Sequence, residues 1–241
     1  MPAVDRSLGL RITVAAVLAA LLLVPSSLIA VLVVDNWAPL HDLDLTVTDA
    51  LHGFAVDHPA WVRAMAVWSI VFAPTSLRIA AAVLAVWLWR RGASRVAVWV
   101  VITMTVGGAL GGLLKLLVGR HRPDLLEPVA RATGYSFPSG HALNSALAAG
   151  VFLLVLLPFV KERRWLRAVL WAVAIVVPLI TGVSRVGLGV HWTSDVVAGW
   201  LLGVAVVAAT TAGFEAWRGR VGRRKVDVTG EGVEPEIATD G

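Results

Sequence analysis

The chain has 241 residues, of which 58% are hydrophobic, 15% are charged and none is cysteine. A soluble globular domain carries roughly 25% charged residues, and here the apolar residues come in long blocks that are mostly free of charge, which argues strongly against a water-soluble enzyme. Without cysteine there is no disulfide, no thiolate nucleophile and no Cys-ligated zinc or iron–sulfur site.

Five apolar blocks are long enough to cross a membrane. A bilayer core of about 30 Å needs about 20 apolar residues in a helix, and residues 12–34, 96–117, 142–159, 166–183 and 196–214 meet this length. The first block follows Arg6 and Arg11, as the core of a signal peptide would. It is too long for one and lacks a convincing small-residue cleavage site, so we expect an uncleaved first span.

The remaining span, which is the second in chain order, is less regular. After a loop at residues 35–60, the apolar stretch 61–89 is divided by Pro74 and interrupted by Arg78. Its first part, residues 61–73, would be only about 20 Å long at 1.5 Å per residue. We therefore expect an interfacial helix that leads into a single crossing.

Six spans give a chain with both termini on one side, and the basic residues choose the side. Positive charge accumulates in cytoplasmic loops. With both termini in the cytoplasm, the inner side holds Arg6, Arg11, Arg90, Arg91, Arg95, Lys161, Arg163, Arg164, Arg167, Arg218, Arg220, Arg223, Arg224 and Lys225, fourteen of the 21 basic residues. The sequence thus predicts an all-α, polytopic bundle in the cell membrane over residues 1–214, and a basic, then acidic, disordered cytoplasmic tail over residues 215–241.

The third predicted span ends in a cluster of positive charge. Lys115 and Arg122 are seven residues apart, two helical turns, so both can project from one face of a helix that Pro123 helps to end. Cations that merely snorkel to the membrane interface would look the same. Arg120 and His121, between them, take no role from the pattern.

The fourth predicted span directly follows Pro138, Ser139, Gly140 and His141. Proline and serine suit a helix start, glycine lets a ligand approach the backbone, and free N–H groups at a helix N-terminus bind anions. The stretch is therefore a candidate phosphate site, although an ordinary turn before an interfacial histidine would contain the same residues.

The connection from the fifth span to the sixth carries Arg185, His191 and Asp195. His191 and Asp195 are at positions i and i+4, so on a helix the carboxylate can hydrogen-bond one ring nitrogen and leave the other free and nucleophilic. A helix-capping aspartate near a chance histidine is the alternative interpretation.

All three clusters lie at the outer ends of predicted spans, so they can converge on one site. Lys115, Arg122 and Arg185 can neutralise phosphate oxygens, and Ser139 and the Gly140 N–H can add hydrogen bonds. One histidine can attack phosphorus while the other protonates the departing oxygen. Because one must be deprotonated and the other protonated, we expect a bell-shaped dependence of rate on pH.

The three stretches resemble the signature motifs of the type 2 phosphatidic acid phosphatase (PAP2) superfamily. The motif KxxxxxxRP lies at residues 115–123, PSGH at 138–141 and SRxxxxxHxxxD at 184–195, with every motif position filled. The resemblance is specific over residues 115–195, and the six-span plan extends it to Phe214.

This resemblance implies a role for each motif residue. His191 would be the nucleophile that forms a phosphohistidine, Asp195 would orient its ring, and His141 would protonate the leaving group and then activate water. The phosphate-binding set would be Lys115, Arg122, Ser139, Gly140 and Arg185. Such enzymes work without a metal, so we expect no metal and no other cofactor.

Three other functions fit parts of the pattern. A metal hydrolase could use His141, His191 and Asp195 as zinc ligands, but three cations at the same point would repel a divalent ion. A vanadate-dependent haloperoxidase would share the pocket, but those proteins are soluble. A non-catalytic lipid-phosphate binding or transport protein would not need complete motifs.

An outward-facing phosphate pocket among membrane helices suits an amphiphile whose head enters while its tails stay in lipid. We expect hydrolysis of a lipid phosphate or diphosphate, such as phosphatidate, phosphatidylglycerophosphate or a polyprenyl diphosphate, and no nucleic-acid partner. Apolar residues facing the membrane carry no readable code, so the sequence chooses neither the lipid nor the oligomeric state.

Overall fold

The computed structural model describes residues 6–125, 128–221, 228, 230 and 231. Within these residues the chain is helical and contains no strand. The helices are α1 (Arg6–Val34), α2 (Ala38–Asp57), α3 (Pro59–Val71), α4 (Pro74–Arg90), α5 (Ser94–Val118), α6 (Gly140–Leu156), the short 3-10 helix η1 (Leu157–Val160), α7 (Arg164–Gly187) and α8 (Thr193–Arg220).

Six helical segments of the described chain are long and apolar enough to cross a bilayer. They are Ile12–Val34, Pro59–Arg90, Ser94–Val118, Gly140–Val160, Arg164–Gly187 and Thr193–Arg220, which confirms the six predicted spans. The chain is therefore an all-helical, multi-pass membrane protein. The irregular second span consists of α3 and α4 with a break at Phe72 and Ala73, directly before Pro74. That α3 lies in the interface remains a prediction.

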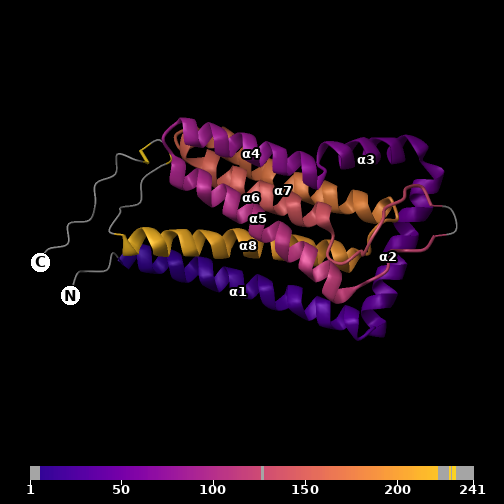
Figure 1. The fold of residues 1–241 in the computed structure, drawn as a ribbon. Helices are drawn as coiled ribbons and strands as arrows, with labels where there is room; N and C mark the ends of the chain where they lie inside the picture. The colour runs from indigo at the N-terminus through magenta and orange to yellow at the C-terminus, as the bar shows by residue number, and fades with distance from the viewer. Residues whose placement is uncertain (1–5, 126–127, 222–227, 229, 232–241) are drawn as a thin grey trace, which may run out of the picture.

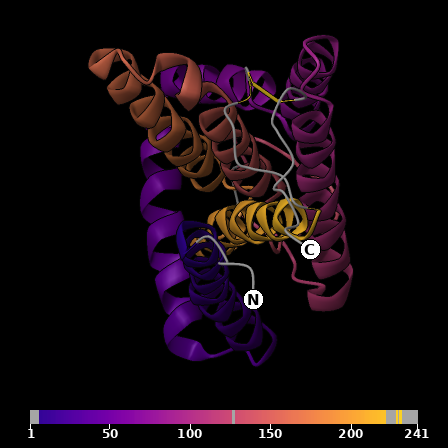
Figure 2. The ribbon, with the colours of Figure 1, turned by 90° about the vertical axis from the view of Figure 1, so that its left-hand side faces the viewer.

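The helices form a bundle with two distinct ends. In Figure 1, α1 begins and α8 ends at the left, while α2 runs across the right-hand end, near the long connection from α5 to α6. Viewed end-on in Figure 2, α8 lies in the middle of the bundle. It packs against α1, α6, α5, α7 and α2. The first and last helical ends thus share one side, as an even number of crossings requires.

The loop predicted at residues 35–60 is largely a helix, so that prediction was wrong. Pro39 lies in the first turn of α2, where proline is well tolerated. The buried residues Asp44, Thr48 and Ala55 share one side of the helix, which packs on α7 and α8. Burial of this side stabilises α2 across the end of the bundle, and the apolar pattern of the sequence does not reveal it.

Small residues bring α6 and α8 close together. A Cβ atom added to Gly199 would lie 2.8 Å from the Ser139 carbonyl oxygen, and one added to Gly203 would lie 2.7 Å from the Ala146 Cβ. Such small residues four apart allow membrane helices to approach backbone to backbone. The close approach lets the Ser139 N–H donate to the Asp195 carbonyl oxygen at 2.9 Å, which joins two of the predicted motifs.

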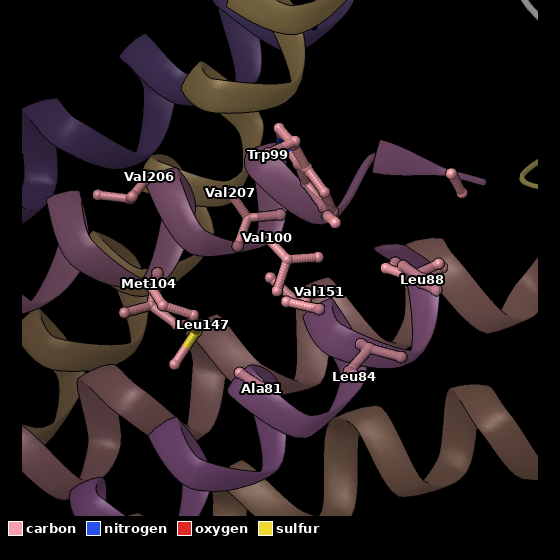
Figure 3. Packing of buried hydrophobic residues seen from close by; sticks show 14 of the residues in the cluster. Ala81, Leu84, Leu88, Trp99, Val100, Met104, Leu147, Val151, Val206 and Val207 are labelled. Carbon is pink, nitrogen blue, oxygen red and sulfur yellow. The ribbon is translucent and has the colours of Figure 1, made fainter. Parts of the chain in front are cut away.

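The main apolar core lies toward the other end of the bundle, between α4, α5, α6 and α8. Leu88, Val100, Leu147, Val151 and Val206 are among its buried residues, and Figure 3 shows the helices that carry them. By contrast, large apolar residues on the outer faces of α1 and α7 are exposed, as expected for helices surrounded by lipid.

The last helix is longer than predicted. We placed the end of the sixth span at residue 214, but α8 continues to Arg220 because Glu215 and Arg218 are buried in the protein and Arg218 lies over the Phe214 ring. Farther on, the Glu231 carboxylate accepts hydrogen bonds from the Arg95 and Val96 N–H groups, at 3.0 and 3.3 Å. Most of the remaining tail lies outside the described residues, so its predicted disorder remains a prediction.

Candidate active site

The three predicted motifs meet at the end of the bundle that α2 crosses. Lys115 is in the last turn of α5, Gly140 and His141 begin α6, Arg185 is in the last turn of α7, and Asp195 is in the first turn of α8. Helix ends from four different spans therefore supply one site.

Arg122 does not continue α5, contrary to the prediction that Lys115 and Arg122 share a helix face. The helix ends at Val118 because Gly119 adopts a left-handed conformation, φ 62°, and its N–H caps the Lys115 carbonyl. Both cations nevertheless turn to the same loop. Lys115 Nζ donates to the Tyr135 carbonyl at 2.6 Å, and Arg122 donates to the Gly134 carbonyl at 2.9 Å.

His191 is held between a carboxylate and an arginine. Its Nδ1 lies 3.4 Å from Asp195 Oδ2, and its Nε2 lies 3.1 Å from Arg122 Nη1. His191 itself is in the turn before α8, so the predicted helical i, i+4 pair is instead a turn residue facing the first helical turn. Asp195 also accepts the Trp192 N–H at 3.0 Å, which fixes this turn on the helix start.

Burial sets the protonation of His191. Only 3% of the residue is exposed, and the pKa of His191 is lowered to about 4, chiefly by this desolvation and also by Arg122 and Arg185, while Asp195 opposes the shift. Burial also lowers the pKa of Arg122, against the attraction of Asp195. At neutral pH His191 is therefore an uncharged imidazole. Arginine can only donate, so Nε2 accepts and the ring proton is on Nδ1, facing Asp195.

The turn at residues 138–141 has the predicted helix start, and it contains an unmatched polar atom. Ser139 is the N-cap residue of α6, and its Oγ is buried with no hydrogen-bond partner among the described residues. Arg185 Nε is likewise buried with no hydrogen-bond partner among the described residues. Buried polar atoms are normally satisfied, so both positions suit an anion that accepts from them.

Three further residues belong to the site and were missed or left unassigned in the sequence. Ser69 of α3 accepts a hydrogen bond from Arg185 Nη1 on its hydroxyl at 3.0 Å, and its carbonyl lies 3.2 Å from His141 Nε2. Nothing in the sequence around Ser69 indicates this, since the contact depends on how α3 packs against α7.

The other two are Arg120 and Asp44. Arg120 donates to Asp195 Oδ1 at 2.8 Å through Nη1 and to Asp44 Oδ2 at 2.7 Å through Nη2. Asp44 is fully buried and accepts the Ser194 N–H at 2.8 Å as well as the Ser194 hydroxyl. The two carboxylates thus share one guanidinium at the start of α8. The position of Arg120 inside the first motif could have indicated a role in the site. Asp44 lies in no motif, so the sequence gives no indication of its role.

Comparison with known sequences agrees with this geometry. A sequence model of the PAP2 superfamily matches residues 96–218, about half of the chain. The chain belongs to the PAP2 superfamily. The match contains all three motifs, so the resemblance drawn from the sequence is confirmed.

Several PAP2 relatives are named as lipid phosphatases. The chain is 36% identical over 116 residues to an undecaprenyl-diphosphatase from Sulfolobus acidocaldarius, covering 45% of this chain and 50% of that protein. It is 38% identical over 98 residues to phosphatidylglycerophosphatase B from Bacillus subtilis, covering 39% and 46%. The chain thus spans about half the length of these two relatives. A lipid A 4'-phosphatase from Bacteroides thetaiotaomicron is 29% identical over 193 residues, covering 74% and 76%.

A solved structure shares the fold. The crystal structure of a transmembrane PAP2-type phosphatidylglycerolphosphate phosphatase from Bacillus subtilis superposes with a TM-score of 0.73 at 22% identity. The superposition covers 83% of this chain and 96% of that one. The helical arrangement described here is therefore a known PAP2 arrangement.

Proposed function

We propose that this protein is a metal-independent phosphatase that hydrolyses the phosphate monoester or diphosphate of a lipid at the outer face of the membrane. The observation that carries the proposal is the contact of His191 Nε2 with Arg122, at 3.1 Å, opposite the Asp195 carboxylate. A nucleophile, an orienting carboxylate and a phosphate-binding cation lie together. The names of the relatives, which act on undecaprenyl diphosphate, phosphatidylglycerophosphate and lipid A, support the substrate class.

In this proposal Arg122 exchanges partners when substrate binds. Arginine and phosphate form charge-assisted, often bidentate hydrogen bonds, so a phosphate oxygen replaces His191 Nε2 as an acceptor for Arg122. The Nε2 lone pair is then free to attack. Lys115 and Arg185 neutralise further oxygens, while Ser139 Oγ and Arg185 Nε, unmatched in the structure, gain acceptors.

The first chemical step forms a bond between His191 Nε2 and phosphorus and breaks the bond from phosphorus to the leaving oxygen, which keeps the electron pair. His141 gives its proton to that oxygen. Because the Ser69 carbonyl can only accept, His141 Nε2 carries hydrogen, and Nδ1 is the nitrogen that exchanges the catalytic proton. In the second step water attacks phosphorus, His141 recovers a proton from it, and the N–P bond breaks to release phosphate.

Arg120 and Asp44 act in this scheme as positioning residues. The imidazolium-like ring of the phosphohistidine needs the Asp195 carboxylate in place, and Arg120 holds Oδ1 of that carboxylate at 2.8 Å. Asp44 in turn anchors Arg120 and the N-terminus of α8. Asp195 is thus fixed on one oxygen by Arg120 and on the other by the Trp192 N–H and His191.

The test is phosphate release by the purified protein from phosphatidate, phosphatidylglycerophosphate and a polyprenyl diphosphate in mixed micelles. We expect release from at least one lipid, unaffected by a chelator and abolished to below about one thousandth by His191→Ala, since the nucleophile is lost. The control is His121→Ala, which removes an exposed histidine from the loop between α5 and α6. No release from any lipid would reject the proposal. Release that survives His191→Ala would reject the phosphohistidine, and activity restored by zinc after chelation would reject the metal-free mechanism.

A further inference from the structure

A charged side chain in the second span has no place in the scheme above. Arg78 lies one helical turn after Pro74 on α4, and its side chain is exposed at the surface of the bundle. A guanidinium at membrane depth costs free energy unless it finds partners, so an intramembrane arginine suggests a function.

Only some of the hydrogen-bond donors of the Arg78 guanidinium have partners in the protein. Arg78 Nε donates to Asn144 Oδ1 at 3.0 Å, whereas guanidinium has five N–H donors. In the described part of the chain no carboxylate lies within ion-pair distance of Arg78. The Nη groups therefore remain available to an acceptor from outside the protein.

Those Nη groups lie at an apolar groove between α4 and α5. The groove has a volume of about 440 Å³, and Arg78 is the only charged residue among the described residues that line it. Apart from Thr105, the other lining residues are small or apolar, such as Ala82, Val101 and Ala109. Three of its lining residues, Ala81, Val100 and Met104, are labelled in Figure 3 on α4 and α5. A groove of this composition suits a hydrocarbon chain with one polar group beside it.

Gly108 of α5 makes room for the guanidinium in the groove. A Cβ atom at this position would lie 3.0 Å from Arg78 Nη2 and 3.4 Å from Cζ. Because Gly108 has no side chain, the Arg78 head can lie against α5.

The groove also lies next to the candidate phosphate site, displaced from it along α5 toward the interior of the membrane-spanning region. Gly108 precedes Lys115 by seven residues on α5, about 10 Å along the helix axis at 1.5 Å per residue. Asn144, which accepts from Arg78, donates from Nδ2 to the Gly140 carbonyl at 2.8 Å. A lipid whose phosphate lies at Lys115 would thus pass Arg78 with the part of the molecule that follows its headgroup.

We propose that the α4–α5 groove binds the glycerol-ester region and one acyl chain of a diacylglycerol phosphate, with the Arg78 Nη groups donating to an ester carbonyl oxygen. This rests on the proposed function. In a glycerolipid the ester carbonyls are the first acceptors below the phosphate, whereas a polyprenyl chain is hydrocarbon from its first carbon and offers none. Arg78 therefore selects ester-linked glycerolipids over polyprenyl substrates.

The test compares two synthetic substrates that differ only in the carbonyls: a diacylglycerol phosphate and its dialkyl ether analogue of equal chain length. For the wild type we expect kcat/KM to be about tenfold higher for the ester, the typical effect of a hydrogen bond from a charged group. Arg78→Met should remove this preference by lowering the ester value and leaving the ether value unchanged. Arg63→Gln removes an exposed arginine from α3 and should keep the preference.

A second variant keeps the charge and guards against misfolding. Gly108→Ala should displace the guanidinium and reduce the ester preference several-fold, since Ala is well accommodated in a helix. Equal rates for ester and ether in the wild type would overturn the inference. The inference would also be overturned if Arg78→Met lowered kcat/KM equally for both lipids and for a water-soluble phosphate ester. Arg78 would then act through Asn144 on the turn at residues 138–141. A wild type that releases phosphate from no lipid would instead reject the proposed function itself.

Discussion

At the scale of single residues, the protonation of His191 gives a pH prediction. Because burial lowers the pKa of His191 to about 4, the free protein keeps this proposed nucleophile uncharged at all pH values well above 4. We expect kcat/KM for a water-soluble aryl phosphate, whose leaving group needs no proton, to be level from neutral pH down to about pH 5, to be halved near pH 4, and to fall about tenfold per unit below that. If kcat/KM were instead halved near pH 6.5, which is the pKa of an exposed histidine, the buried geometry in which Arg122 contacts His191 would be contradicted.

The residues of the site were predictable to different degrees. His191, Asp195 and the cations were found because their chemistry depends on residue type and spacing, both of which a sequence displays. Ser69 was not found, because a serine becomes a ligand of Arg185 only through the packing of two helices. The contact of Arg122 with His191 could not be predicted either, because it requires α5 to end at Val118 with Gly119 in a left-handed conformation.

At the scale of elements, α2 links a segment without motifs to catalysis. Asp44→Asn should lower kcat about tenfold to a hundredfold with little change in KM, because Arg120 loses a charged anchor and Asp195 loses its fixed position. Asp49→Asn, on the exposed side of the same helix, is the matched control and should leave kcat unchanged.

A second measurement separates positioning from general destabilisation of α2. Trapping of the phosphorylated His191 intermediate after a rapid alkaline quench, in which the N–P bond is stable, should show slower formation in Asp44→Asn at a temperature where its unfolding curve still shows a folded protein. Arg120→Lys should behave similarly, since an ammonium cannot bridge two carboxylates as a guanidinium does. Wild-type kcat in both variants, or an equal loss in Asp49→Asn, would remove α2 from the mechanism.

At the scale of the whole molecule, the bundle was predictable because lipid imposes simple rules. Every spanning segment must be apolar and about 20 residues long, so the blocks of the sequence map directly onto helices. What failed were features that lipid does not dictate: α2, which lies across the bundle end and has only one buried side, and the end of α8, where protein contacts bury Glu215 and Arg218. Amphipathic, partly buried helices leave a weaker pattern than spanning ones.

The side of the membrane that the site faces is a prediction from charge, and a chain without cysteine permits a direct test of it. The positive-inside rule predicts that the loop between α6 and α7 lies in the cytoplasm and that the loop between α5 and α6, with the site, lies outside. A membrane-impermeant maleimide added to intact cells should therefore label an Ala132→Cys variant, whose position is exposed in the outer loop. A Glu162→Cys variant, exposed in the inner loop, should react only after the membrane is permeabilised. The reverse pattern would place the site in the cytoplasm, and lipid phosphates of the inner leaflet would then be its substrates.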